Sequence, residues 1–490
     1  MLQFSISITM QRIPFFLIFS ILLTFTVSCK KPDKTQGTLQ FSETFIHFDT
    51  VFTGIGSITR NFTVYNKSNN DIVTTVFLAG GKSSKYSINV NGMAGTPNNN
   101  SYFKDIAIPK KDSIFVFVKV NINPGNVNDP FLVSDSVVFL TTQKQQDVKL
   151  LAYGQDAHYV IANQGSGNFR YKIVAKEHET TTWTKDKPYV VHGWAAIDSL
   201  GTLIIEPGTR VYFHSNSGLW AYRYSTLKVG DDNIDADNGV RGDPVLFRGD
   251  RLEKWFDEDY AQWSRIWINE GADVKINNAI ITNAFVGIQV EPLPTNNNHI
   301  ILEPNTVKIS NTIIKNTKDC GVLSRFLNID MTNCVIANNG GSSLHLEGGK
   351  YTMKHLTIAN YFRQSERKAP ACYISNVVSL YDDMKMEIDA MLINCIVTGK
   401  NEKEVILNKK SDEAFNIKFQ NCLLKAPNNN FFEECLLNLD PKFVDANKLD
   451  FSLQSSSPAI GKGKADTNVG YDILGNPRKS PSAIGAYEYY

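Results

Sequence analysis

The residues best able to do chemistry are concentrated in one short stretch, between positions 248 and 263. Tryptophan and tyrosine faces suit sugar rings, while arginine and carboxylate side chains hydrogen-bond hydroxyl or uronate groups. We therefore predict a ligand-binding surface made by Arg248, Trp255, Tyr260 and Trp263. Three upstream aromatic residues would extend it: Trp220, Tyr222 and Tyr224. The alternative is a loop folded on to its own domain, with its aromatic rings packed inside and its ion pairs outside.

The same stretch holds side chains that a polysaccharide-degrading enzyme would use. A glycoside hydrolase needs a pair of carboxyl groups at a set separation, and a lyase needs a base beside a neutralised uronate. Asp250, Asp257 and Asp259 supply acids, and Arg251 or Arg248 supplies the neutralising charge. Their spacing is diagnostic of neither reaction. The histidines stand singly in the sequence and are interpreted as structural, among them His192, His214, His345 and His355.

Oxygen-bearing side chains alternate in a second stretch, at Asp231, Asn233, Asp235 and Asp237. Calcium takes about six to eight oxygen ligands, and a tight loop can bring alternate side chains to one ion. The stretch lacks the glycine and the terminal glutamate of an EF-hand loop, so a solvated turn is the alternative. Calcium is the only cofactor that the sequence suggests, and none is required. The cysteines form no CxxC pair, which argues against a zinc site.

The N-terminus carries an export signal. Arg12 precedes an apolar run that is too short for a comfortable membrane span, and the run ends just before Cys29. This layout resembles a bacterial lipoprotein signal, which implies that Cys29 is acylated and becomes the new N-terminus. We expect residues 1–29 to be the signal peptide and residues 30–38 to be a tether. The lipid would anchor the protein to the outer membrane of the cell envelope, on its periplasmic or its surface side.

Length and composition limit the possible fold classes and binding partners of the chain. With 490 residues the chain is too long for one ordinary core, so we expect at least two domains. Lysine and arginine number 50 against 49 acidic residues, a balance that gives no long-range attraction to nucleic acid. The 29 phenylalanines, 19 tyrosines and 32 glycines favour strands and turns, and therefore an all-β protein.

Residues 39–155 read as short alternating strands separated by turns. Phe62 and Val64 fall on one face of the first clear strand, and residues 113–120 and 136–140 repeat the pattern. Strands at this spacing predict a β-sandwich. The stretches GSITRNFTVYN, IPKKDSIFVFVKVNINPGN and LLAYGQ resemble immunoglobulin-like domains of the ASPM/SPD-2/Hydin type. Such domains serve as spacers or docking modules, and we assign no catalysis to this one.

Residues 156–490 contain an internal repeat. Successive copies are separated by steps of 33, 22, 22, 39 and 27 residues, as in solenoid coils that accept insertions at their turns. The fourth position of each copy is polar: Asn278, Asn311, Asn333, His355, Asn394 and Asn421. We expect a parallel β-helix in which these residues adopt left-handed turns and bond to one another along the stack.

The repeat also predicts the interior of the β-helix. Ile280, Ile313 and Ile336 are expected to stack inside it. Three cysteines directly follow the repeat asparagine, where other copies have alanine, threonine or leucine: Cys334, Cys395 and Cys422. We interpret them as small buried apolar residues rather than as disulfide partners or reactive thiols.

Longer stretches of this domain resemble a known group. LGTLIIEPGTRVYF, GDPVLFRGDRLEKWFDEDYAQWSRIWI, DPKFVDANKLDFSLQSSSPAIGKG and DILGNPRKSPSAIGAYEY are similar to the first coils and the C-terminal cap of Bacteroidetes cell-envelope lipoproteins. The resemblance implies a right-handed, pectate-lyase-like β-helix with a C-terminal cap, but no chemistry. We expect a lipid-anchored envelope protein whose β-helix binds a glycan or protein ligand without catalysis. The alternative is a polysaccharide lyase or glycoside hydrolase on the same scaffold.

Overall fold

A computed structural model describes residues 37–95, 102–125, 127–167, 169–231, 241–293, 305–378, 380, 384–465 and 467–490. The predicted signal peptide with Cys29 and residues 30–36 of the tether lie outside the described residues. So do Asn233, Asp235 and Asp237 of the predicted calcium loop, whereas Asp231 lies inside them. Within the described ranges, no helix has the length and apolar character needed to cross a membrane.

The chain divides into two compact units, and the first is a β-sandwich formed by the described residues up to Phe48 with Gly54–Ile122 and Leu132–Tyr153. One five-stranded sheet has the order β1 (Gln40–Phe41), β3 (Arg60–Tyr65), β8 (Ser113–Val120), β5 (Tyr86–Val90) and β6 (Met93–Ala94). The other has the order β2 (Phe45–Phe52), β10 (Gln145–Gln155), β9 (Phe131–Leu140), β4 (Ile72–Leu78) and β7 (Tyr102–Ile108).

Alternating side chains build the core of the sandwich. Phe62 and Val64 of β3 are 1% and 0% exposed, which confirms the face predicted for them. Phe62 meets Phe139 of β9 edge to face, with the ring centroids 6.1 Å apart, so the two sheets share one aromatic core.

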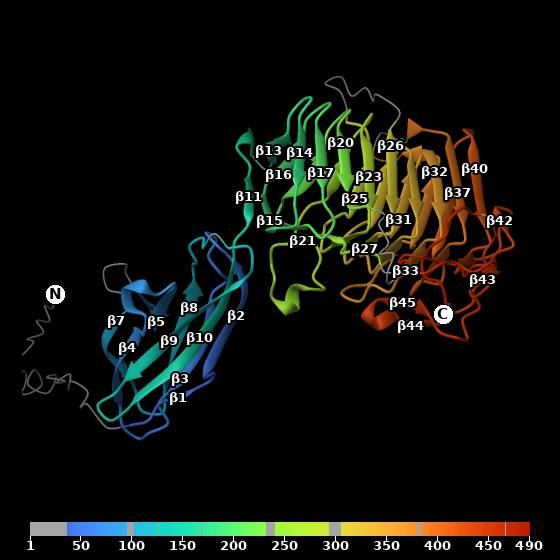
Figure 1. The fold of residues 1–490 in the computed structure, drawn as a ribbon. Helices are drawn as coiled ribbons and strands as arrows, with labels where there is room; N and C mark the ends of the chain where they lie inside the picture. The colour runs from blue at the N-terminus through green and yellow to red at the C-terminus, as the bar shows by residue number, and fades with distance from the viewer. Residues whose placement is uncertain are drawn as a thin grey trace, which may run out of the picture. The chain divides into compact units, whose positions relative to one another are not determined.

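The second unit is a right-handed parallel β-helix of three long sheets (Figure 1). Sheet 1 runs through β12 (Gln164–Ser166), β13 (Phe169–Ala175), β16 (Trp194–Ile197), β19 (Gly218–Ala221), β22 (Ile266–Ile268), β25 (Ile288–Val290), β28 (Val322–Arg325), β31 (Leu344–Glu347), β34 (Cys372–Ser375) and β39 (Val405–Asn408). Sheet 2 runs through β14 (Thr180–Trp183), β17 (Thr202–Ile205), β20 (Thr226–Val229), β23 (Asp273–Asn277), β26 (Thr306–Ser310), β29 (Ile329–Thr332), β32 (Gly349–Lys354), β37 (Ile388–Ile393), β40 (Phe415–Gln420) and β42 (Phe432–Glu433).

Sheet 3 completes each coil and has eleven strands. They are β11 (His158–Ile161), β15 (Tyr189–His192), β18 (Arg210–Phe213), β21 (Val245–Gly249), β24 (Ala279–Thr282), β27 (Ile313–Lys315), β30 (Val335–Ala337), β33 (Thr357–Asn360), β38 (Ile396–Gly399), β41 (Leu423–Leu424) and β43 (Leu436–Leu437). The predicted all-β fold, a sandwich followed by a β-helix, is therefore confirmed.

The corner between sheets 2 and 3 is the repeat asparagine itself. Asn278 joins β23 to β24 with φ of 51°, and His355 does the same between β32 and β33 with φ of 55°. Asparagine tolerates this left-handed conformation better than most residues, which explains its recurrence. The side chains also bond along the stack: the Asn333 amide donates to Asn311 Oδ1 at 3.2 Å, and the Asn394 amide lies 3.2 Å from His355 Nε2. The predicted ladder is confirmed.

The interior differs from the prediction at two isoleucines. Ile336 is fully buried, but Ile280 and Ile313 are only half-buried. Their neighbours Ile281 and Ile314 fill the interior instead, in register with Ile336. Side chains alternate along a strand, and the residue just after the corner points inward, so the next one must point outward. The three cysteines that follow the corner are each 0% exposed and form no disulfide, as predicted: Cys334, Cys395 and Cys422.

Thiol reactivity should follow this burial. Burial raises the pKa of Cys334 to about 12, and it holds the pKa of Cys422 well above the ordinary value. Cys435 is only partly buried, and a hydrogen bond with Cys422 lowers its pKa. We therefore expect a thiol reagent to modify Cys435 first in the folded protein and to reach the other two only after denaturation. Mass spectrometry of labelled peptides measures this order, with Cys435→Ser as the control; native labelling of Cys334 as fast as Cys435 would contradict the stacked interior.

The outward face of sheet 3 is covered in part by the C-terminal cap, and the outward side chains of sheet 2 are solvated. On sheet 3 the C-terminal cap, with β44 (Phe443–Asp445), η5 (Ala446–Lys448) and β45 (Asp450–Leu453), packs Phe443 and Phe451 over Ile396 and Leu423. On sheet 2 the outward side chains are solvated, as at Lys228, Lys275 and Lys308 in one register column. The outward face of sheet 1 differs from both, because aromatic and charged side chains gather on it.

Candidate functional site

The predicted surface at residues 248–263 is a loop pinned to the coils. It leaves the end of β21, contains the short helix η3 (Lys254–Phe256) and returns to β22. The Asn283 amide donates to the carbonyls of Asp257 at 3.0 Å and Asp259 at 2.5 Å. The Gln262 amide donates to the Phe256 carbonyl at 2.7 Å. The loop is thus folded on its own domain, which was the alternative interpretation.

The predicted ligand-binding role of Trp263 is wrong. Its side chain is 1% exposed and stacks on Phe213 with the ring centroids 4.3 Å apart, and its indole N–H donates to the Thr282 carbonyl at 2.8 Å. The residue pairs with Ala284 of the next coil, where a small side chain leaves room for the indole inside the β-helix.

The other predicted site residues contact different partners. Arg248 pairs with Asp257 at 3.1 Å, and Arg251 pairs with Glu253 at 3.3 Å. Asp250 bonds to His214 outside the loop, and Tyr260 packs on Phe362 with 5.5 Å between centroids. Asp250 and Asp257 are therefore each engaged with a different basic residue. Trp255, at 54% exposure, is the most exposed aromatic ring of this loop, and Phe256 and Tyr260 are partly exposed.

A different surface, which we call the sheet 1 face, gathers side chains from six successive coils. Strand register places its central residues in one column, each flanked in its strand by buried residues and therefore pointing outward. The column comprises Trp220, Trp267, Gln289, Leu323, His345 and Tyr373. Trp220 is recognisable in the sequence as a candidate but Trp267 is not, because only the strand register brings these distant residues together.

Aromatic rings form the first part of the sheet 1 face. Trp220 and Trp267 stack with centroids 5.6 Å apart and an interplanar angle of 18°. Phe169 stands edge-on to both rings, and Trp194 packs against Trp267 at 5.9 Å. The Trp220 indole N–H donates to Asn269 Oδ1 at 2.6 Å, which fixes the orientation of its ring. Because Trp220 and Trp267 remain partly exposed, the cluster offers solvent a rigid aromatic platform.

Ion pairs form the second part of the sheet 1 face. Arg325 contacts Glu291 at 2.7 Å and Glu347 at 2.9 Å, and His345 lies 3.2 Å from Glu347. Burial alone would raise the pKa of Glu347, but the hydrogen bonds and charges of His345 and Arg325 outweigh it and lower the pKa. Arg265 and Gln289 continue the network toward the tryptophans, since Arg265 bonds to Gln289 and Gln289 bonds to Glu291.

A pocket of about 380 Å³ opens where this network ends. Leu323, Arg325, His345 and Tyr373 line it from the strands of sheet 1. Loops that enter sheet 1 in three successive coils supply the remaining lining residues: Asp319, Cys320, Gly341, Ser342, Ala369 and Pro370. The Tyr373 hydroxyl accepts a hydrogen bond from the Asn408 amide, and its ring packs on His345 with the centroids 4.6 Å apart. Hydrogen-bonding groups thus line a concave surface next to aromatic rings.

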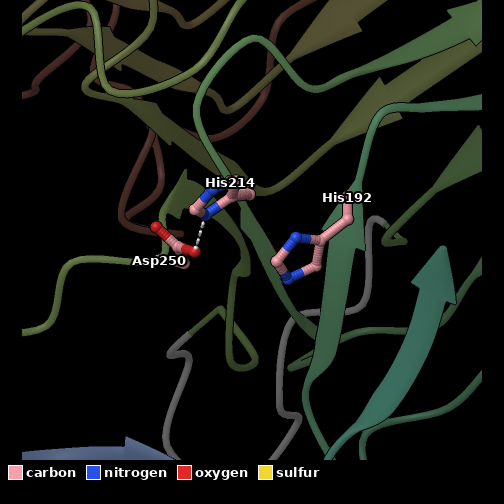
Figure 2. Close-up of side chains that lie close together, drawn as sticks. All are labelled: His192, His214 and Asp250. Carbon is pink, nitrogen blue, oxygen red and sulfur yellow. Dashed lines mark hydrogen bonds and ion pairs between the residues drawn. The ribbon is translucent and has the colours of Figure 1, made fainter. Parts of the chain in front are cut away.

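Two histidines that look isolated in the sequence lie together in sheet 3. His192 and His214 stack with ring centroids 4.5 Å apart, and His214 Nδ1 lies 2.7 Å from Asp250 Oδ2 (Figure 2). Burial lowers the pKa of His192, whereas the hydrogen bond to Asp250 raises the pKa of His214. They stand singly in the sequence, and the stacking of successive coils brings them together. Their spacing equals the 22-residue step of the repeat, and that signal could have revealed the pair.

Comparisons with known proteins leave the function open. No protein-family model matches the chain, and no curated protein matches it. Among solved structures, the catalytic unit of a GH87 α-1,3-glucanase from Streptomyces thermodiastaticus aligns over 77% of this chain and 87% of its own, with 10% identity and a TM-score of 0.26. A PapD-like domain of human CEP192 aligns over 31% of this chain and 96% of its own, with 11% identity and a TM-score of 0.16.

The YadV chaperone aligns over 23% of this chain, with 15% identity and a TM-score of 0.16, and the alignment spans only 50% of the chaperone. At such TM-scores these likenesses carry no argument about activity. The fold rests on the strand pairing described above, and any function must be argued from the site itself.

Proposed function

We propose that this protein is a lipid-anchored component of a bacterial cell envelope whose sheet 1 face binds a glycan chain without cleaving it. The observation that carries the proposal is the outward column from Trp220 to Tyr373. A partly exposed tryptophan pair lies at one end, the pocket lies at the other, and Gln289 and Leu323 between them are buried. The column crosses five strand-to-strand steps of about 4.8 Å, or about 24 Å in total, which suits several sugar rings better than one.

The charges of the pocket favour a neutral glycan. Arg325 lines the pocket, but Glu291 and Glu347 both hold it and offset its charge. A uronate would therefore meet carboxylates as well as the guanidinium, whereas a hydroxyl group can donate to the carboxylates and accept from His345 or Tyr373. Neutral oligosaccharides should consequently bind more tightly than uronate-rich ones.

The lowered pKa of Glu347 argues against this residue as the general acid of a glycosidase. A glycosidase needs one carboxyl group that stays protonated near neutral pH as a general acid. Glu347 instead stays ionised because His345 and Arg325 stabilise its charge. Incubation with a bound glycan should therefore release no reducing ends; release that disappears in Glu347→Gln would show that the face is an active site.

Loss of a platform tryptophan should weaken glycan binding. A glycan array first identifies an oligosaccharide, and calorimetric titration then measures its affinity for each variant. We expect Trp267→Ala to weaken binding by about 2 kcal/mol, as is typical of a central aromatic anchor. Trp255→Ala is the matched control, because Trp255 is a more exposed tryptophan in the loop at residues 248–263. If Trp255→Ala weakens binding and Trp267→Ala does not, the glycan binds at the loop of residues 248–263 instead.

The anchor is the remaining part of the proposal, and it rests on the lipoprotein-like signal that ends at Cys29. We expect Cys29→Ala to leave the protein either soluble or with its signal uncleaved, because the acyl chains would supply the membrane affinity. Metabolic labelling with a fatty-acid analogue and membrane fractionation measure this. A variant that is still acylated and membrane-bound would show that Cys29 is not the anchor.

A further inference from the structure

We propose that His192, His214 and Asp250 form a binding site for a divalent transition-metal ion, of which Zn²⁺ is the best match. The three residues occupy equivalent places in successive coils, at the end of β15 and directly after β18 and β21. One ligand atom of each lies within 4.8 Å of the others. Figure 2 shows the His214 ring turned toward Asp250, with the His192 ring beside it.

The donor set selects the kind of ion. Imidazole nitrogens suit zinc and its neighbours in the first transition series, whereas calcium and magnesium prefer oxygen ligands alone. Two imidazoles with one carboxylate, and a fourth position left to solvent, are typical of zinc sites that keep an exchangeable ligand. The absence of CxxC pairs, which argues against a cysteine site, has no bearing on a site made by histidines.

Small side-chain movements suffice to close the site. Zinc bonds of about 2.0–2.2 Å in a tetrahedral arrangement place ligand atoms about 3.4 Å apart. His214 Nδ1 and Asp250 Oδ2 lie 2.7 Å apart, so these two atoms have to separate slightly. The ligand atom of His192, which lies within 4.8 Å of them, has to move further. The His214 side chain is 51% exposed and can turn, while Asp250 is 12% exposed and held by its backbone N–H, which donates to the Phe213 carbonyl at 3.0 Å.

The surroundings do not oppose a cation. Arg251 is the positive group whose charge reaches His214, but its guanidinium is paired with Glu253 and lies over the Phe256 ring at 4.2 Å. The loop at residues 248–263 therefore does more than cover the coils. The loop supplies Asp250, which completes the cluster. It also pairs Arg251 with Glu253, so that the arginine is turned toward that carboxylate.

Calorimetric titration of the full chain with Zn²⁺ tests the site. The titration is done in a Cys435→Ser background, so that zinc taken up by the partly buried Cys435 thiol does not contribute to the signal. We expect one ion per chain, and at least about tenfold weaker binding in His192→Ala, His214→Ala and Asp250→Asn, since even losing a hydrogen-bond partner behind a ligand costs this much. His158→Ala is the control. His158 pairs with Asp186 at 3.3 Å, so this substitution removes a similar histidine–carboxylate pair outside the cluster.

Cobalt substitution gives a second readout that does not depend on stability. Co²⁺ held by three protein ligands in a four-coordinate site should give intense visible absorption, and each of the three variants should abolish it while circular dichroism stays unchanged. Failure of the background protein to bind Zn²⁺ would overturn the proposal. So would binding that survives both His192→Ala and His214→Ala.

Discussion

Trp263→Ala is expected to lower the free energy of unfolding of the β-helix by about 3–5 kcal/mol, the usual cost of removing a large buried aromatic side chain. The indole stacks on Phe213, bonds to the Thr282 carbonyl and is 1% exposed, so its removal leaves a cavity and breaks that buried hydrogen bond. Chemical denaturation followed by a probe in the β-helix measures the change.

Trp255→Ala is the control for this substitution. Its side chain is 54% exposed, and surface substitutions away from special features change stability by about 0.5 kcal/mol or less. If both variants lose the same small amount, Trp263 is not the core residue described here, and the loop at residues 248–263 again becomes the leading candidate for ligand binding.

Glu404→Ala is expected to have a second large effect, again about 3–5 kcal/mol, because it leaves a buried guanidinium without its counter-charge. The Arg367 and Glu404 side chains form an ion pair at 3% and 0% exposure. Glu404 also accepts hydrogen bonds from the backbone N–H groups of Ala371 and Asn401, both at 2.8 Å. It therefore holds the segment that carries Ala369 and Pro370 in the wall of the sheet 1 pocket.

A double variant separates charge from packing. In Arg367→Met with Glu404→Gln neither of these two positions carries a charge. Replacing a buried ion pair by uncharged residues of similar size often changes the free energy of unfolding only slightly. We expect this variant to recover most of the stability that Glu404→Ala loses, as measured by the same denaturation experiment. A double variant as unstable as Glu404→Ala would mean that the backbone contacts, and not the ion pair, hold this segment.

The fold could be predicted because its signals repeat. The corner asparagine recurs in coil after coil, since a single left-handed residue must join sheets 2 and 3 each time, and one weak preference becomes a clear pattern. Inward and outward residues were harder to separate. In β24 both Ile280 and Ile281 are apolar, so composition alone does not show which of them faces the core.

The sites could not be predicted in the same way. Coils vary in length, and this variation hides the register that places Trp220 beside Trp267 and His214 beside Asp250. Trp263 follows a charged loop in the sequence, which favours an exposed side chain, whereas the residue pairs with Ala284 of the next coil and its side chain is buried in the core. Local sequence reports the chemistry of side chains, but in a solenoid only the strand pairing tells which of them are neighbours.

The most direct test of the proposed function is a crystal structure of the protein with the oligosaccharide that the array identifies. The sheet 1 face should then carry sugar rings between Trp220 and Tyr373, with hydroxyl groups hydrogen-bonded to His345 or to the carboxylates around Arg325. An oligosaccharide bound at the loop of residues 248–263, or anywhere else away from this face, would contradict the account.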